Sequence, residues 1–569
     1  MINSFCQKCP FILFSCSFAG YSCGQNISKM DNNASVSVVK MLYRDVLSKV
    51  FQALPLIERI NAGRACKNWL NIAQQTKGCD DTIVFRVNSL DRIRLVMKSP
   101  FVRNVSNLFF QDYNNDDSYR SEWITAVSGL LQMTNNLREF YVDGMRMTEK
   151  ECAMIVDQGF PTTHSLTTIS ICRCELNEKH AESVARLIQK STQLQKLTLI
   201  ECDFGAHGLQ LIANSIRNSS SETLIDLCMT ANNMQDVGIV CLCKEIVHCQ
   251  SLASLGLRHN ELGTQGIISL THVLQNNSRL TTIDLSINKI NQNNIGILMN
   301  SINYITNINL SFCDLGSDGI VIMSNILQNK PSITCLNLQA SNMGPTSTKA
   351  LAELVQNNKS IQQLQIGCHW SDQIVSGVTN VVKMIKANHS WLRVLELGSN
   401  CLTFYDVLDI AEAIHSNTHL SSFDISGSHL HNHVSMKALA RAFESNTSII
   451  SLNLGNCSLQ YSGLEILIDH IKNNKTITCL SLKNNFIKES GINTLAEYIK
   501  CNNTIKTLDI SFNEVNENNV LHLIEALEYN KSLTSLIMRH CKMNEQAKLL
   551  LNQTYKKLQQ NNRLIKIYL

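Results

Sequence analysis

The amino-acid sequence predicts an α/β solenoid, in which parallel strands form one side of a long array and helices form the other. One motif recurs about every 28 residues from Leu137 to the C-terminus. Between its copies, the spacing of apolar residues changes from every second residue to the spacing of a helix. A short stretch of amphipathic helices, unrelated to the motif, precedes the array. A strand–helix unit repeated at this period predicts a stack of units that share one continuous core.

The motif reads Leu/Ile-x-x-Leu-x-Leu-x-x-(Asn/Cys)-x-Leu, and we number its positions from 1 to 11. Clean copies begin at Leu252, Leu280 and Ile505. Apolar residues at positions 4 and 6 alternate with polar ones, which predicts a strand with one buried face. Motif copies are expected to start at Leu137, Leu166, Leu194, Leu224, Leu252, Leu280, Ile305, Ile333, Ile361, Leu392, Leu420, Ile449, Ile477, Ile505, Leu533 and Leu564.

A helix is predicted between successive strands. Ile492, Leu495 and Ile499 follow the spacing of one helix face in the repeat that starts at Ile477. Strands stack about 4.8 Å apart, whereas helices are about 10 Å across. The helix side must therefore be longer. We expect a horseshoe with parallel strands on its concave face and helices on its convex face.

The repeat resembles leucine-rich repeats of the ribonuclease-inhibitor type, over residues 137–569. We expect repeats over 137–543 and a C-terminal cap over 544–569, where residues 546–560 have a helical pattern. Leu549, Leu550, Leu551 and Leu558 are expected to face inward there. Residues 77–136 are expected to hold degenerate first repeats or a linker, with strand-like segments at 83–87 and 105–110. The resemblance implies a protein-binding surface and no enzymatic activity.

Position 9 explains many of the cysteines, of which the sequence has 22. Asn and Cys alternate at this position, and both can satisfy backbone groups where the chain leaves the strand. The glycosylation-like Asn-x-Ser/Thr sequences also follow the repeat, because most lie just before a strand, where Asn suits a turn. They are at Asn276, Asn358, Asn474, Asn502 and Asn530. We therefore expect reduced thiols and a cytoplasmic location, with the nucleus as the alternative.

Residues 1–38 are expected to be a disordered leader or a mis-assigned start. The apolar run at residues 10–20 is a weak match to a signal peptide, since Lys8 is its only basic residue and its core is broken. Translation from Met30 or Met41 is the simpler interpretation. No later stretch has the roughly 18 apolar residues of a membrane-spanning helix, so no membrane partner is expected.

Residues 39–76 do not fit the repeat and resemble an F-box. The family pattern is matched at Asp45, Leu47, Val50, Phe51, Leu54, Pro55, Leu56, Glu58, Arg59, Cys66, Lys67 and Trp69. The sequence departs from it at Leu42-Tyr43, where the family has Leu-Pro, and at Ala65, where Val is usual. The resemblance implies a small all-α module that docks the Skp adaptor of a Skp–cullin–F-box ubiquitin ligase. The contacts that it implies are Leu42, Leu47, Val50, Phe51, Leu54, Pro55 and Ile60. Alternatively, these are core residues of a helical cap.

A ligand is expected to contact the residues that alternate with the apolar positions of each strand. Most are small and polar, so aromatic and cationic exceptions are candidates. The candidates for binding a protein substrate are Arg258, His259, Phe312, Trp370, Lys483, Phe512, Arg539 and His540. A wider set adds Tyr141, Arg173, Lys196, Ile200, Ile287 and Lys289. For any single residue, an ordinary solvated side chain is the simpler interpretation. Lys483, Phe512, Arg539 and His540 lie on three successive repeats, and we expect them to act together.

Other chemistry is not indicated. A net charge of +4 with 6% aromatic residues does not favour nucleic acid. The sequence has no Gly-x-x-x-x-Gly-Lys-Ser/Thr loop for a nucleotide. His429, His431 and His433 lack paired cysteines or carboxylates, so solvated loop histidines are expected rather than a metal site. No nucleophile–base pair and no cofactor site are predicted.

Three functions therefore stay open from the sequence. The first is the substrate-recognition subunit of a Skp–cullin–F-box ligase, with the adaptor and cullin as partners and no catalysis of its own. The second is a stand-alone leucine-rich-repeat scaffold or inhibitor that binds a protein. The third is a GTPase-activating protein of the Ran type, which is less favoured because that family ends in an acidic tail and this sequence ends near Arg563 and Lys566.

Overall fold

The computed structural model describes residues 82–86, 90–98, 102, 105–111, 120–134, 136–160, 165–367, 377–400, 402–560 and 565–568. The chain divides into two compact units, an N-terminal unit that ends at Gly256 and a C-terminal unit that begins at Leu257. We describe each unit by itself.

The N-terminal unit alternates strands and helices, and its strands pair in parallel with their neighbours in chain order. The strands are β1 (Thr82–Arg86), β2 (Asn107–Gln111), β3 (Glu139–Asp143), β4 (Thr168–Cys172), β5 (Lys196–Ile200), β6 (Asp226–Cys228) and β7 (Ser254–Gly256). The helices are α6 (Leu90–Met97), α7 (Arg120–Met133), α8 (Glu149–Gly159), α9 (Glu178–Lys190), α10 (Gly205–Ser220) and α11 (Gln235–Ile246).

The C-terminal unit continues the same alternation, again with parallel neighbours in chain order. Its strands are β8 (Thr282–Asp284), β9 (Asn307–Asn309), β10 (Cys335–Asn337), β11 (Gln363–Gln365), β12 (Val394–Glu396), β13 (Ser422–Asp424), β14 (Ser451–Asn453), β15 (Cys479–Ser481), β16 (Thr507–Asp509), β17 (Ser535–Ile537) and β18 (Lys566–Tyr568). Its helices are α12 (Thr264–Asn276), α13 (Ile295–Ser301), α14 (Gly316–Leu327), α15 (Pro345–Asn357), α16 (Val378–Lys386), α17 (Phe404–Ser416), α18 (His433–Ser445), α19 (Gln460–Ile471), α20 (Glu489–Cys501), α21 (Glu517–Tyr529) and α22 (Glu545–Gln560).

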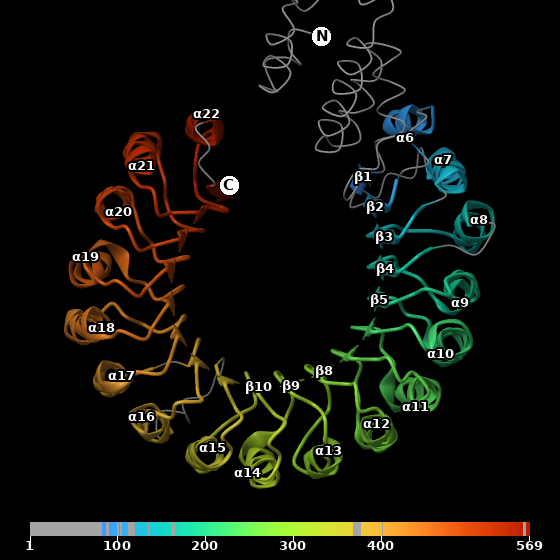
Figure 1. The fold of residues 1–569 in the computed structure, drawn as a ribbon, viewed down its shortest axis with the longest axis horizontal. Helices are drawn as coiled ribbons and strands as arrows, with labels where there is room; N and C mark the ends of the chain where they lie inside the picture. Colours follow the sequence, from blue (N-terminus) through green and yellow to red (C-terminus); the bar gives the residue numbers. More distant parts are fainter. Residues whose placement is uncertain are drawn as a thin grey trace, which may run out of the picture. The chain divides into compact units, whose positions relative to one another are not determined.

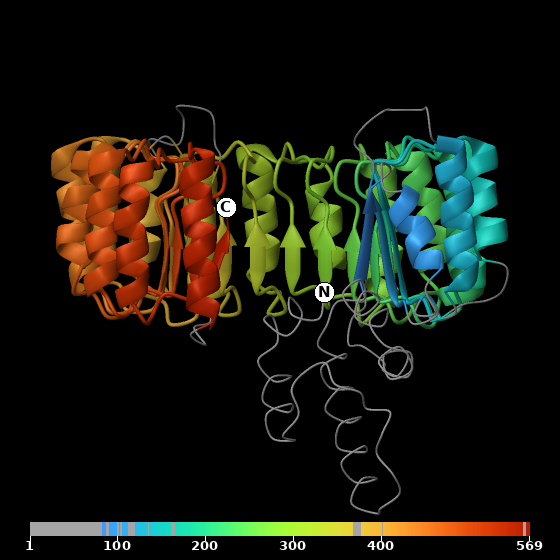
Figure 2. The ribbon, with the colours of Figure 1, turned by 90° about the horizontal axis from the view of Figure 1, so that it is seen from above.

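Each unit has two layers, a strand layer and a helix layer (Figures 1 and 2). The core lies between them and is built from the apolar motif positions and the inner helix faces. In the repeat of β16, Ile505, Leu508 and Ile510 are fully buried, as are Val520 and Leu523 of the helix that follows. Burying a side chain of this size contributes about 1.5–3 kcal/mol. The predicted α/β array of parallel strands and helices is confirmed over the described residues.

Position 9 connects each repeat to the one before it. The amide oxygen of buried Asn513 accepts hydrogen bonds from the backbone N–H groups of Asn485 and Ile487, both at 3.0 Å. Its Nδ2 donates to the carbonyls of Leu482 and Ile510, also at 3.0 Å. Where Cys stands at position 9, the side chain has only a thiol to donate. The thiol of Cys457 donates to the carbonyls of Gly455 at 3.4 Å and Ile425 at 3.5 Å. The predicted role of this position in satisfying backbone groups is confirmed.

A second ladder of asparagines follows the helices and explains most of the glycosylation-like sequences. Asn530 is buried, and its Nδ2 donates to the carbonyls of Ile499 at 2.6 Å and Asn502 at 2.8 Å. Because these amides are already bonded to the preceding repeat, they are structural in the folded chain. Asn276 differs from the prediction: it is exposed on the last turn of α12, and its neighbour Asn277 occupies the buried site.

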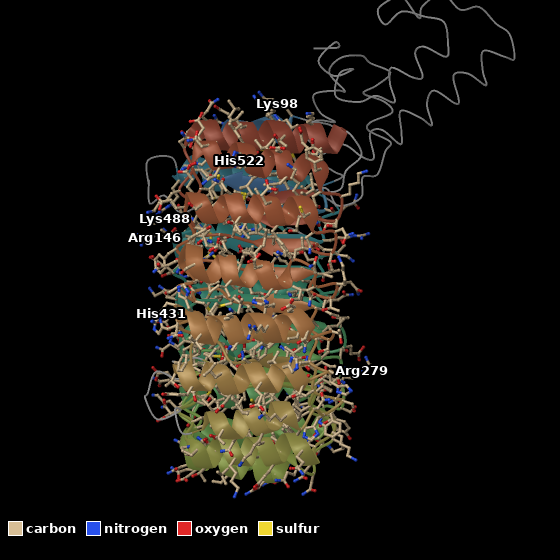
Figure 3. The ribbon with its side chains drawn as sticks, turned by 90° about the vertical axis from the view of Figure 1, so that its left-hand side faces the viewer. Lys98, Arg146, Arg279, His431, Lys488 and His522 are labelled. Atoms are coloured by element: carbon tan, nitrogen blue, oxygen red, sulfur yellow. The ribbon has the colours of Figure 1, made fainter. Side chains whose placement is uncertain are left out.

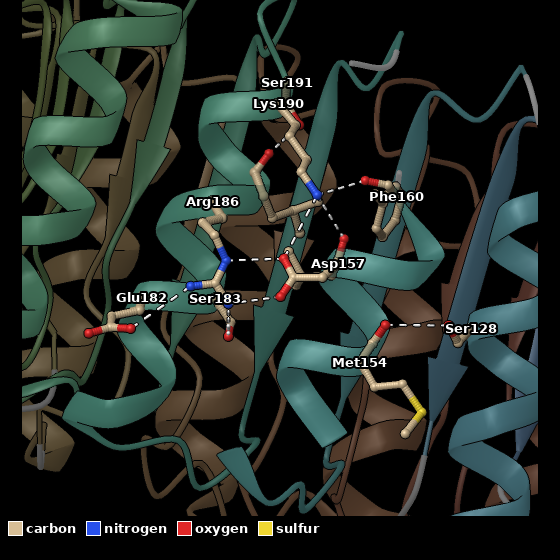
Figure 4. A network of polar contacts seen from close by, with 11 residues as sticks. Ser128, Met154, Asp157, Phe160, Glu182, Ser183, Arg186, Lys190 and Ser191 are labelled. Carbon is tan, nitrogen blue, oxygen red and sulfur yellow. Dashed lines mark hydrogen bonds and ion pairs between the residues drawn. The ribbon is translucent and has the colours of Figure 1, made fainter. Parts of the chain in front are cut away.

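Polar side chains also join neighbouring helices on the outer face of the N-terminal unit. Asp157 of α8 accepts from Arg186 of α9 at 3.0 and 3.1 Å, and Lys190 Nζ lies 3.8 Å from the same carboxylate (Figure 4). Lys190 also donates to the carbonyls of Val156 and Phe160, at 3.2 and 2.8 Å. One helix thereby caps the carbonyl end of its predecessor, where a cation is favoured.

The ends of the array differ in detail from the sequence prediction. The segments predicted as strand-like at 83–87 and 105–110 are β1 and β2, which pair in register with each other. In the terminal helix α22, Leu551 and Leu558 are buried as predicted, but Leu549 is half exposed. Residues two apart in a helix point about 200° away from each other around its axis, so Leu549 and Leu551 cannot lie on the same face.

Candidate functional site

The described candidate residues of the C-terminal unit lie just beyond the strands, at motif positions 7 and 8, and not on the strands as the sequence predicts. Lys483 follows the end of β15, Phe512 follows β16, and Arg539 follows β17. In the repeat of β16, Asp509 Oδ1 accepts the backbone N–H of Ser511 at 2.9 Å, which turns the chain away from the strand direction.

The loops that follow the strands run toward one edge of the C-terminal unit. In Figure 3, His431 and Lys488, which both lie in such loops, point from one edge, and Arg279, which precedes β8, lies at the opposite edge. Positions 7 and 8 therefore form a rim where the strands end.

Position 8 has a left-handed backbone, which L-residues adopt at a cost of roughly 1–2 kcal/mol. The φ angles are 56° at His259, 57° at Phe312, 59° at Phe512 and 54° at His540. Seven other repeats fill this position with smaller or more tolerant residues, namely Gly144, Ala231, Ala340, Ser399, Gly427, Asn456 and Asn484, and three fill it with larger ones, namely Arg173, Glu201 and Ile287. The fold therefore does not need an aromatic ring there. Phe312 and Phe512 are nevertheless nearly half exposed, at 47% and 46%. A strained, exposed aromatic residue is a candidate for function. Phe486 in the loop after β15 is also exposed, with a φ of 55°, but among the described residues only Phe512 of these two has a ring and a cation beside it.

The structure brings Lys483, Phe512, Arg539 and His540 together with Tyr568, and we call these five residues the strand-end cluster. The rings of Phe512 and His540 are 4.7 Å apart at 34°. Lys483 Nζ lies 5.0 Å from the centre of the Phe512 ring, and Arg539 Cζ lies 5.5 Å from that of Tyr568. Cations over ring faces are attracted to them by about 0.5–1 kcal/mol at exposed sites.

The backbone under the cluster is well fixed. Phe512 N–H donates to the carbonyl of Arg539 at 2.9 Å, and Arg539 N–H donates to Ser511 Oγ at 3.1 Å. The buried asparagines of position 9 lie directly after Lys483-Asn484 and Phe512, and connect each of these repeats to the one before it. The cluster is thus presented on rigid backbone, which lowers the entropy cost of binding.

The cationic side chains of the strand-end cluster form no ion pairs with described carboxylates. Among the described residues, no carboxylate pairs with Lys483, Arg539 or His540, whereas other cations of the C-terminal unit do pair, as Lys500 does with Glu525 at 2.9 Å. Exposed aromatic rings with unpaired cations have the composition of a binding hot spot.

The other predicted ligand residues are not part of this cluster. Arg258 is half buried and donates to Ser286 Oγ at 3.1 Å, while His259 beside it is exposed. Phe312 follows β9 and has no ring partner among the described residues. Trp370 lies outside the described residues. So do the predicted adaptor contacts Leu42, Leu47, Val50, Phe51, Leu54, Pro55 and Ile60.

Sequence reasoning missed Tyr568. The signal was the register of the last motif: Ile567 pairs with Leu536, which places Tyr568 at position 5 beside Ile537. It also missed Phe109, which precedes the first clean repeat, and Asp143, which stands next to Gly144.

Two further observations concern the described ranges only. No three His, Cys, Asp or Glu side chains within them gather as metal ligands do; the rings of His429 and His431 are 6.2 Å apart. No helix of these ranges has the length and apolar character needed to cross a bilayer.

Comparison with known proteins agrees with the repeat. A scan against protein-family models finds no match. Human NACHT, LRR and PYD domains-containing protein 5 is 30% identical over 150 residues, which are 26% of this chain and 12% of that protein. Human NACHT, LRR and PYD domains-containing protein 14 is 26% identical over 275 residues, or 48% of this chain and 22% of that protein. The mouse protein of the same name is 24% identical over 187 residues, 32% of this chain and 19% of that protein.

The chain is a leucine-rich-repeat protein. It is distantly similar to the leucine-rich-repeat regions of the NACHT, LRR and PYD proteins, and it spans less than a quarter of the length of each of these three relatives. Among solved structures, an internalin from Listeria monocytogenes aligns with a TM-score of 0.31 at 13% identity, over 79% of this chain and 94% of the internalin. None of these comparisons indicates an F-box.

Proposed function

We propose that this leucine-rich-repeat protein is a non-catalytic scaffold that binds a protein partner through the strand-end cluster. The observation that carries the proposal is the exposed Phe512 on a left-handed backbone, stacked on His540 under Lys483. Other described repeats satisfy the fold at this position without an aromatic ring, with glycine, alanine, serine or asparagine in seven and with Arg173, Glu201 or Ile287 in three. A ligand therefore best explains the exposed ring and the unpaired cations gathered around it.

The cluster favours an acidic partner. Lys483, Arg539 and His540 offer donors without a carboxylate partner among the described residues, and Lys566, two residues before Tyr568 on β18, is also exposed. Rings of Phe512 and Tyr568 supply the apolar contact area of a hot spot. An acidic segment that carries an apolar side chain would match both features, with attraction that weakens as salt rises.

Affinity capture from a cell extract, with the full chain as bait, tests this function. The double variant Phe512→Ala/Arg539→Ala should lose about 30-fold or more in affinity for whatever wild type captures, since two hot-spot residues are removed. The matched control is Phe486→Ala/Lys488→Ala, which also removes one exposed phenylalanine and one exposed cation from a loop of the C-terminal unit.

The control should capture the same partner as wild type. If the Phe512→Ala/Arg539→Ala variant captures it with unchanged affinity, the strand-end cluster is not the binding surface and the proposal fails.

A second function, the substrate receptor of a Skp–cullin–F-box ubiquitin ligase, is supported by the F-box-like pattern of residues 39–76. The similarity to other proteins supports the scaffold more directly, because it lies in their leucine-rich-repeat regions. Co-purification with the Skp adaptor tests the ligase function: wild type should bind it and Val50→Glu/Phe51→Glu should not. If wild type does not bind the adaptor, this function fails while the scaffold proposal stands.

A further inference from the structure

The N-terminal unit has a hollow on its strand face, near the carboxyl ends of β2 to β5. Its volume is about 290 Å³, which suits one inserted side chain better than a whole ligand of the usual size. Its lining residues include Phe109, Tyr141, Asp143, Cys172, Arg173 and Glu201. Of the lining residues, the sequence predicts Tyr141, Arg173 and Ile200 as candidate ligand contacts.

One wall of the hollow is aromatic. The rings of Phe109 and Tyr141 stack at 5.6 Å and 26° on neighbouring strands, and both side chains are partly exposed. The Tyr141 hydroxyl donates to Glu139 Oε2 at 3.0 Å. Burial, and then this carboxylate, raise the pKa of Tyr141 to about 12, so the phenol stays neutral at physiological pH. A phenol that donates to a carboxylate has a more electron-rich ring face, which attracts cations.

The charges around the hollow are mainly negative. Arg173 is clamped to Asp143, with Nε at 2.9 Å from Oδ1 and the second terminal nitrogen at 2.6 Å from Oδ2. This bidentate pair largely cancels the charge of the only cation in the lining. Glu201 remains in the lining, and Glu139, which accepts the Tyr141 hydroxyl, lies outside it; neither pairs with a cation among the described residues. A positively charged side chain would therefore be attracted into the hollow.

Some exposed rings of the C-terminal unit have a cation over them, whereas Phe312 and Phe486 have none among the described residues. Three rings of the C-terminal unit have a cation of the same unit over them: Lys483 over Phe512, Lys500 over Tyr529 and Arg539 over Tyr568. No described lysine or arginine lies over Phe109 or Tyr141 in this way. The hollow thus has the ring faces and the carboxylates of a cation site, while its one lining cation, Arg173, is paired with Asp143.

We propose that the hollow binds an arginine or lysine side chain from a basic, extended segment of a protein partner. The cation lies against the rings of Phe109 and Tyr141, and Glu139 and Glu201 balance its charge. The aliphatic stem contacts Ile200 at the rim. This site is independent of the strand-end cluster and has the opposite charge preference.

Binding of three synthetic peptides to the full chain tests the proposal by calorimetry. They are repeats of Gly-Arg-Ser, of Gly-Gln-Ser and of Gly-Glu-Ser. We expect the arginine peptide to bind, more weakly at high salt, and the other two not to bind the hollow. Tyr141→Leu should weaken the arginine peptide about tenfold. Tyr141→Phe keeps the ring and should weaken it less. Phe512→Ala should leave it unchanged, which separates this site from the strand-end cluster.

Protection of Cys172 gives a readout that needs no variant. This half-buried thiol lines the hollow, whereas Cys501 is exposed in the C-terminal unit. The arginine peptide should slow alkylation of Cys172 by N-ethylmaleimide at least threefold and leave Cys501 unchanged, as measured by mass spectrometry.

The proposal is overturned if the glutamine peptide protects Cys172 as well as the arginine peptide does. It is equally overturned if the arginine peptide gives no protection, or if Tyr141→Phe and Tyr141→Leu bind the arginine peptide as wild type does.

Discussion

The two units use the same repeat but present different surfaces. In the N-terminal unit, β1 to β5 are five residues long, and Phe109, Tyr141, Ser170 and Thr198 stand at position 5. In the C-terminal unit every strand is three residues long. There, position 5 is often Asp or Asn, whose side chain accepts the N–H of position 7, as in Asp284, Asn309, Asn337, Asp424, Asn453 and Asp509.

Strand length decides what positions 7 and 8 can do. In the longer strands, Asp143, Cys172 and Ile200 still belong to the strand and line a hollow. In the shorter ones the chain has already turned, so Lys483 and Phe512 form a rim. The strands β6, β7, β11, β12, β15 and β17 are equally short with other residues at position 5, as at Cys228, Ser481 and Ile537, so an Asp or Asn at that position is not required for a short strand. One repeat thus supports an anionic hollow in one unit and a cationic cluster in the other.

The largest expected effect separates the two residue types of position 9. Asn513→Ala leaves the N–H groups of Asn485 and Ile487 and the carbonyl of Leu482 without a side-chain partner, which should cost about 3–5 kcal/mol. Cys202→Ala in the N-terminal unit removes only weak thiol bonds of 3.5 and 3.6 Å and should cost about 1 kcal/mol. Hydrogen exchange measured by mass spectrometry reports each unit separately. Equal loss of protection in the two variants would contradict the importance of the asparagine ladder.

The second-largest expected effect is a different loss of stability in the two units at alkaline pH. Burial raises the thiol pKa to about 11 at Cys152 and Cys249 and to about 12 at Cys174 and Cys243, all in the N-terminal unit. In the C-terminal unit, Cys313 and Cys457 are raised to about 12 in the same way. Unfolded thiols ionise near pH 9, so the folded state holds more protons above that pH. The contribution of these thiols to the free energy of unfolding is therefore fully present below pH 9. It is lost as the pH rises toward the raised pKa values of the folded state.

Because the N-terminal unit contains more of these thiols, it should become sensitive to proteolysis first. Limited proteolysis at pH 7, 9 and 10, with the fragments assigned by mass spectrometry, measures this order. Earlier cleavage of the C-terminal unit would mean that buried thiols do not control the alkaline stability of the repeats.

The smallest expected effect on stability comes from Phe512→Asn. Asparagine tolerates a left-handed backbone and occupies the same position at Asn456 and Asn484. Relief of strain and loss of the ring contacts should nearly cancel, so the free energy of unfolding should change by less than about 1 kcal/mol. Capture of the partner should nevertheless fall. A loss of more than about 2 kcal/mol would instead make Phe512 a structural residue.

The sequence predicts the repeat far better than its surface. Apolar residues at positions 1, 4 and 6 must be buried, so the strand order and the core follow from spacing alone. The exposed rim does not, because it depends on where each strand ends. Asp509 ends β16 through its own hydrogen bond to Ser511, which moves Phe512 off the alternating pattern. Tyr568 belongs to the cluster only through the register of β18, and the Phe109–Tyr141 stack only through that of β2 and β3.

The most direct test of the binding surface is photo-crosslinking from the cluster itself. Benzoylphenylalanine replaces Phe512 in one variant and Phe486, the more exposed phenylalanine at 59%, in another. The full chain is then irradiated in a cell extract, and the products are compared by mass spectrometry. We predict one protein partner that crosslinks at position 512 and not at position 486, and that is lost at high salt. Equal crosslinking at both positions, or a partner found only at position 486, would contradict the strand-end cluster as the binding surface.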